Sequence, residues 1–160
     1  MRGTLRKKGY SAAWNNLVRL GLTDDSFVLH DANKMTYREL VSAFTPGEGL
    51  AQVEERICAF LHLTKDSEAF KKLQWLGLFD EVKIELEQGS PAAILQHLLQ
   101  QKWKLKAGEL DMIVMYHELE YELNNQPKKL TSSLVAKGET QVLTAMAKTV
   151  GLPMAIATKL

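Results

Sequence analysis

The feature that most constrains the fold is a change of hydrophobic period after about residue 104. Before that point, apolar side chains recur every three or four residues, as in helices that bury one face. From Asp111 the sequence is apolar at consecutive positions, and then Leu119, Tyr121 and Leu123 alternate with glutamates. Such alternation is typical of a strand with one exposed face. The sequence therefore predicts an α+β fold, in which a helical part precedes a β part.

Five helices are expected in the first part. The apolar periodicity places them near residues 11–20, 37–45, 50–61, 70–76 and 91–104. Ser11 is expected to cap the first helix, and Thr36 with Glu39 has the spacing of a capping box before the second. Gly77 is expected to end the fourth helix, and Ser90-Pro91 to start the fifth.

The second part predicts an antiparallel hairpin and a C-terminal helix. Residues 124–127 carry turn chemistry, and residues 128–137 return as a second strand. Residues 141–160 are again helical in character, with Gly151 and Pro153 expected to interrupt them. Both chain ends resemble the middle of an element, a strand at the start and a helix at the end, so we expect the chain to be a piece of a longer protein.

Composition excludes several classes of protein. With 160 residues, 46% of them hydrophobic and 24% charged, the chain fits one globular domain and not a disordered segment. A net charge of +1 gives no argument for nucleic acid. No apolar run is long enough for a membrane span or a secretory signal, so we expect a cytoplasmic location. The single cysteine, Cys58, cannot form an intramolecular disulfide, and we interpret it as a small buried hydrophobe.

Active-site motifs are scarce. The sequence has no glycine-rich phosphate loop, and its four histidines are scattered, so we predict neither a catalytic residue nor a metal site in it. The basic residues at the N-terminus are a better candidate for a binding site. On a strand, Arg2 and Arg6 would share one face, where two guanidinium groups could clamp a carboxylate. The alternative is a solvated cluster of charges at a terminus.

Four stretches resemble motifs of the saccharopine dehydrogenases of the glutamate-forming kind, and of the C-terminal half of the α-aminoadipic semialdehyde synthases. They occur in that family's order and at roughly its spacing. The stretches are Gly3-Thr4-Leu5-Arg6, Trp75-Leu76-Gly77-Leu78, Asp111-Met112-Ile113-Val114-Met115 and Ala145-Met146-Ala147-Lys148-Thr149-Val150-Gly151-Leu152-Pro153.

The resemblance implies an enzyme in which a substrate domain with a helical insertion follows a nucleotide-binding domain. This chain would hold a substrate-domain strand, the helical insertion, the returning hairpin of a mixed sheet and the start of the helix that returns to the nucleotide-binding domain. These parts would be residues 1–9, 10–107, 108–139 and 140–160. No complete Rossmann domain would be present, so NAD or NADP would bind the parent protein and not this segment alone.

The resemblance also implies a role for Arg6. The family oxidises saccharopine to glutamate and α-aminoadipate semialdehyde, or runs the reverse reaction, and the arginine that matches Arg6 contacts a substrate carboxylate. Arg2 is a second, weaker candidate. Lys7 stands where the family has an aromatic residue, so the packing around the substrate would differ locally. The structural alternative for Arg6 is a salt bridge to Asp111 or Glu118.

Two functional hypotheses therefore stand. One is a segment of an NAD(P)-dependent oxidoreductase, and the other is a non-catalytic binding or subunit-contact module derived from that family. Residues 145–160 are small and apolar on all sides. We expect them to pack on the nucleotide-binding domain of the parent protein or, alternatively, on a second copy of the chain in a homo-oligomer.

Overall fold

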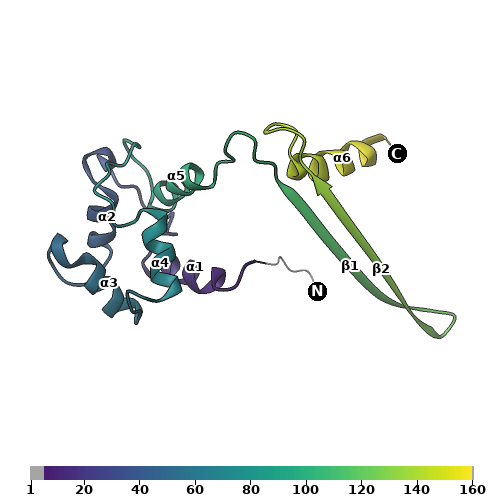
Figure 1. Ribbon diagram of the computed structural model, residues 1–160, viewed down its shortest axis with the longest axis horizontal. Coiled ribbons are helices and arrows are strands. Elements are labelled where there is room, and N and C mark those ends of the chain that lie inside the picture. Colours follow the sequence, from purple (N-terminus) through teal and green to yellow (C-terminus); the bar gives the residue numbers. More distant parts are fainter. Residues whose placement is uncertain (1–5, 160) are drawn as a thin grey trace. The chain divides into compact units, whose positions relative to one another are not determined.

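The computed structural model describes residues 6–159. The chain divides between Trp103 and Lys104 into two compact units, called here the helical unit and the hairpin unit. Figure 1 shows the elements of each. The α+β class is confirmed, and among the described residues the helical unit contains the five α-helices that the periodicity predicts. Whether the predicted boundaries at residues 9, 107 and 139 are domain boundaries of a longer protein stays a prediction.

The described residues of the helical unit form five α-helices and two short 3-10 helices. These are α1 (Tyr10–Arg19), η1 (Ala32–Lys34), α2 (Tyr37–Ala43), η2 (Leu50–Gln52), α3 (Val53–Leu61), α4 (Glu68–Leu76) and α5 (Pro91–Trp103). The predicted capping box is present, because the Thr36 hydroxyl accepts from the Glu39 N–H at 3.1 Å while the Glu39 carboxylate accepts from the Thr36 N–H at 2.6 Å. Gly77 ends α4 in the left-handed conformation, and the Ser90 hydroxyl accepts from the Ala93 N–H at the start of α5.

The start of α1 differs from the prediction. The helix begins at Tyr10 after Gly9, whose φ of 79° suits a residue without a side chain, so Ser11 lies inside the first turn and is not the cap. Residues 6–9 are irregular and are not part of a strand. The rest of the predicted strand, residues 1–5, lies outside the described residues.

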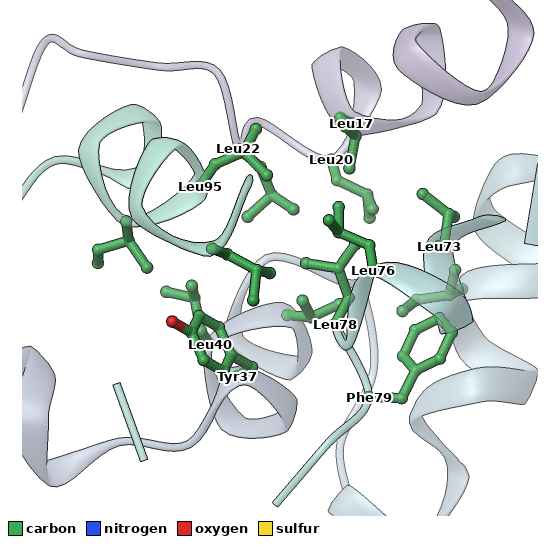
Figure 2. Packing of buried hydrophobic residues seen from close by; sticks show 14 of the residues in the cluster. Leu17, Leu20, Leu22, Tyr37, Leu40, Leu73, Leu76, Leu78, Phe79 and Leu95 are labelled. Atoms are coloured by element: carbon green, nitrogen blue, oxygen red, sulfur yellow. The ribbon is translucent and has the colours of Figure 1, made fainter. Parts of the chain in front are cut away.

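The core of the helical unit collects the apolar faces of all five helices. In Figure 2, Leu17 of α1 and Leu20, which follows the last residue of that helix, lie near Leu73 and Leu76 of α4. Fully burying one leucine-sized side chain contributes about 1.5–3 kcal/mol. Side chains exposed by 2% or less include Leu20, Leu22, Leu40, Val41, Val53, Ile57, Leu61, Leu73, Leu78, Ile84 and Ile94.

One arginine ties three segments of this unit together. Arg38, on α2, forms a bidentate pair with the Glu54 carboxylate of α3, with N···O distances of 2.8 and 2.7 Å. The same guanidinium donates to the carbonyl of Leu50 in η2 and to that of Phe79 after α4. Both charged side chains are mostly covered, with 15% and 25% of their surfaces exposed. A planar guanidinium fits this arrangement better than an ammonium group would.

The hairpin unit contains the predicted hairpin, with strands β1 (Met112–Leu123) and β2 (Gln126–Lys137) in antiparallel register. The turn is narrower than expected. Asn124 and Asn125 alone form it, with φ values of 55° and 59°, the conformation that two-residue hairpin loops require. Gln126 and Pro127 already belong to β2. The described residues of this sheet make two strands, and the larger mixed sheet stays a prediction.

The helix α6 (Ala145–Lys159) is anchored at the open end of the hairpin (Figure 1). The Asp111 carboxylate accepts from the N–H groups of Ala145 and Met146 at 2.7 and 2.9 Å. These two bonds lower the pKa of Asp111 below its usual range. The expected interruption at Gly151 and Pro153 does not occur, since α6 runs through both residues. Pro153 lacks only one N–H donor of the helix.

Most of this unit's apolar side chains are exposed. Met112, Val114 and Tyr116 of β1 expose 56%, 63% and 65% of their surfaces. On α6 the exposed apolar side chains are those of Met146, Val150, Leu152, Met154 and Ile156. In neither unit do the described residues form a helix long and apolar enough to cross a membrane.

Candidate functional site

A pocket of about 390 Å³ opens on the helical unit between α1, α4 and α5. We call it the tryptophan groove, because the chain's three tryptophans, Trp14, Trp75 and Trp103, all line it. Its floor is core, formed by Leu17, Leu73 and other side chains that are 5% exposed or less. The volume falls within the range of small-molecule sites.

Helical spacing explains how α1 and α5 build the walls. Tyr10, Trp14 and Leu17 lie four and three residues apart on α1, so they share one face. Leu99 and Trp103 lie four apart on α5 and share another. The rings of Tyr10 and Trp14 are nearly parallel, with an interplanar angle of 8° and centroids 6.2 Å apart, and they form a flat aromatic wall.

The rim of the groove is basic. Arg6, Lys7, Lys8 and Lys72 line it, and none of its described lining residues is acidic. The guanidinium of Arg6 lies over the Tyr10 ring, 5.4 Å from its centroid, in a cation–π contact.

The ammonium group of Lys72 is held in place by the backbone. It donates to the Lys8 carbonyl at 3.2 Å and lies 3.8 Å from the Glu68 carboxylate. It occupies the space where a side chain at Gly9 would otherwise be, since a Cβ built there meets this nitrogen at 2.6 Å. The glycine at this position therefore serves the groove as well as the start of α1.

The predicted site residues are only partly described. Arg6 is at the rim of the groove, and Arg2 lies outside the described residues, so the two-arginine clamp stays a prediction. The acids named as alternative partners of Arg6 both have contacts inside the hairpin unit. Asp111 caps α6, and Glu118 pairs diagonally across the hairpin with Lys129 at 2.7 Å.

Sequence reasoning missed the convergence of the three tryptophans. Trp14 reads as an ordinary apolar position of α1, and Trp75 enters only as part of a motif. The available signal is the helical spacing of Tyr10 to Trp14 and of Leu99 to Trp103, but spacing within one helix does not tell which helices meet. The exposure of Trp75 and Trp103, 59% and 54%, becomes visible only in the fold.

Other candidate groups have structural roles. Cys58 is half-buried against the core, and burial raises the pKa of its thiol, in agreement with the interpretation as a small hydrophobe. His97 contacts Glu85 and Gln101 at 3.1 Å on the surface. Among residues 6–159, no cluster of three or more His, Cys, Asp or Glu could hold a metal ion.

Comparison with known proteins places the chain in a family. The family model of the saccharopine dehydrogenase C-terminal domain matches residues 1–160, which is the whole chain. The chain belongs to the saccharopine dehydrogenase C-terminal domain family. The resemblance carried by the four sequence stretches is thereby confirmed.

Similar proteins are known from animals, plants and fungi. The chain is 34% identical over 166 residues to the mitochondrial alpha-aminoadipic semialdehyde synthase of Bos taurus, covering 100% of this chain and 18% of that protein. It is 30% identical over 172 residues to the alpha-aminoadipic semialdehyde synthase of Arabidopsis thaliana, covering 97% of this chain and 16% of that one. It is 27% identical over 169 residues to the saccharopine dehydrogenase [NADP(+), L-glutamate-forming] of Schizosaccharomyces pombe, covering 99% of this chain and 37% of the relative. The chain thus spans less than two fifths of each of these relatives.

Proposed function

We propose that the chain is a substrate-domain segment of a saccharopine dehydrogenase, which oxidises saccharopine to glutamate and α-aminoadipate semialdehyde or catalyses the reverse reaction. The observation that carries the proposal is the family match over the entire chain. The names of the fungal relatives give NADP as the cofactor and glutamate as the product. We extend both to the longer protein of which this chain would be part.

In this proposal Arg6 binds a carboxylate of the substrate, with Arg2 as a second contact. Saccharopine carries three carboxylates, and a guanidinium can donate two parallel hydrogen bonds to one of them. The position of Arg6 supports the role, because its side chain is exposed and its guanidinium lies over the Tyr10 ring. The cation–π contact restricts the orientation of the guanidinium.

The exposed faces of the hairpin unit support a larger assembly. A two-stranded hairpin is at best marginally stable in water and gains stability from further strands or a packed helix. Both strands here carry large exposed apolar side chains, and α6 carries more. The proposal assigns the hairpin to a larger substrate-domain sheet and α6 to contact with a nucleotide-binding domain, or with a second copy.

Turnover by the longer protein tests the proposal directly. The purified protein would be mixed with saccharopine and either NADP or NAD, and nicotinamide reduction and glutamate release would be measured together. We expect reduction that depends on saccharopine, with one glutamate released per nicotinamide reduced. A protein that binds the nucleotide and yet leaves saccharopine unchanged contradicts the proposal. Fractionation of cells would test the cytoplasmic location, since the mammalian relatives are named mitochondrial.

The second candidate, a binding module without chemistry, is favoured by the tryptophan groove. None of the described residues that line the groove is a carboxylate, a histidine or a cysteine, so the groove suits binding better than acid–base or nucleophilic catalysis. The sequence that precedes Met1 in the gene distinguishes the candidates. A glycine-rich dinucleotide motif after a strand supports the enzyme, and its absence supports the module.

A further inference from the structure

We infer that the tryptophan groove of the helical unit binds a small aromatic carboxylate. The inference rests on the shape and charge of the groove and does not require the proposed activity. It names a ligand class: an anion whose body is one flat aromatic ring on a short chain.

The aromatic walls of the groove indicate the shape of the apolar part of the ligand. Trp75 and Trp103 keep more than half of their surfaces exposed although they border a pocket, and Tyr10 with Trp14 forms a flat wall of nearly parallel rings. Large exposed aromatic side chains in a concave site gain most by covering another apolar surface. A planar ring fits a flat aromatic wall better than a flexible alkyl chain, since it can stack on it.

The rim determines the charge of the ligand. Four basic side chains and no acidic one line the described part of the groove, so a cation would be repelled and an anion attracted. Lys72 is the best placed of the four. Its ammonium donates to the Lys8 carbonyl beside Gly9 and lies 3.8 Å from the exposed Glu68 carboxylate, so little side-chain freedom remains to be lost when it meets the carboxylate of a ligand. Charge complementarity at the rim and stacking below it together indicate an aryl carboxylate.

Saccharopine has only its carboxylates in common with this ligand class. Its apolar body is a chain of methylene groups, with no ring that could stack on the aromatic wall. The groove also differs from the pocket on the described part of the hairpin unit. That pocket is lined by acidic and basic side chains together, whereas the charged side chains that line the groove are all basic.

Titration of the full chain with 3-phenylpropionate tests the inference. Tryptophan fluorescence reports on this site directly, because all three tryptophans line the groove. We expect a saturable change at one ligand per chain with a dissociation constant on the order of 0.1–1 mM, the range for a ligand of this size. The neutral 3-phenylpropanamide lacks the charge, so its dissociation constant should be at least about threefold higher. Propionate, which has the charge but no ring, should not bind in this range.

Two pairs of variants, measured by calorimetry, locate the ligand. Trp75→Ala should weaken binding about tenfold through lost ring contact, whereas Val82→Ala, an equally exposed position away from the groove, should change nothing. Lys72→Gln should weaken 3-phenylpropionate about threefold and leave 3-phenylpropanamide unchanged. Lys71→Gln, its neighbour on α4 that does not line the groove, is the control. Circular dichroism checks folding, and Trp103→Leu replaces Trp75→Ala if that variant unfolds.

Several results would overturn the inference. They are no saturable binding at millimolar ligand, equal affinity for acid and amide, or full binding by the Trp75 and Trp103 variants. Tryptophan emission that shifts with protein concentration in the absence of ligand would also overturn it, since it would show that a second copy covers the groove.

Discussion

The Arg38–Glu54 pair offers a measurable test of how the helical unit is held together. Replacing Arg38 by methionine keeps an unbranched apolar stem but removes five hydrogen bonds, two to the Glu54 carboxylate and three to backbone carbonyls. The Leu50 carbonyl is exposed and can accept from water instead. The Glu54 carboxylate is largely covered and would lose both of its bonds to the guanidinium.

The expected magnitude follows from the two charged bonds. A hydrogen bond to a charged group contributes about 1.5–3 kcal/mol, and the part exposure of the pair keeps the total near the middle of that range. We expect Arg38→Met to lower the free energy of unfolding by about 2 kcal/mol. With an m value of about 1.3 kcal/mol/M for a unit of roughly this size, the urea midpoint should fall by about 1.5 M.

Urea unfolding followed by tryptophan fluorescence is the assay, because all three tryptophans lie in the helical unit and report on it alone. Lys71→Met, at an exposed lysine of α4, is the matched control and should change stability by less than about 0.5 kcal/mol. If Arg38→Met were no more destabilising than this control, the clamp would not stabilise the unit and the reasoning would be refuted.

The same pair predicts a dependence on pH. The hydrogen bonds from Arg38 lower the pKa of Glu54, so Glu54 binds a proton less readily in the folded chain than in the unfolded one. The stability from the pair is therefore fully present above the ordinary glutamate range and is lost as the pH falls through the lowered value. The difference between wild type and Arg38→Met should shrink over that acidic window. A difference that stays constant there would contradict the assignment.

Three further predictions concern the hairpin unit and the cofactor. Gly138→Ala places a Cβ well inside contact distance of the Asp111 carboxylate, which accepts hydrogen bonds from the first turn of α6, so we expect faster amide hydrogen exchange in that turn. Ala136→Gly is the control, because it leaves Asp111 in place. Asn125→Val should weaken the hairpin turn by about 1–2 kcal/mol because the position needs a positive φ, whereas Asn125→Gly should be tolerated, as cross-strand NMR contacts would show. The chain alone should not bind NAD or NADP, because its glycines never form the dinucleotide motif; micromolar binding by calorimetry would refute the domain assignment.

Local signals predicted the local structure well. The Thr36–Glu39 box, the Ser90-Pro91 start and the asparagine turn each depend on residues within a few positions of one another, so the sequence contains their whole cause. The predictions were wrong where the start or the end of a helix depends on a group distant in sequence or on the tolerance of the helix itself. The α1 helix starts at Tyr10 because Gly9 adopts a positive φ beside Lys72, and α6 continues through Pro153 because one missing donor does not end a helix.

The candidate site was less predictable for the same physical reason. Arg6 is recognisable from its motif, but its contact with Tyr10 depends on how the segment enters α1. The tryptophan groove depends on the packing of α1, α4 and α5, which brings Trp14, Trp75 and Trp103 together from positions up to 89 residues apart. No single window of sequence contains that arrangement.

The most direct test of the central claim is the saccharopine KM of the longer protein with Arg6→Lys. Lysine keeps the charge and loses the two-pronged donor, so binding should weaken by about 1.5–3 kcal/mol, a rise in KM of roughly 10- to 150-fold. Arg19→Lys is the control. Arg19 donates to the carbonyls of Phe60 and Leu61, so this change should lower the melting temperature and leave KM unaltered. An unchanged KM with a lowered melting temperature in Arg6→Lys would contradict the account and give Arg6 a structural role.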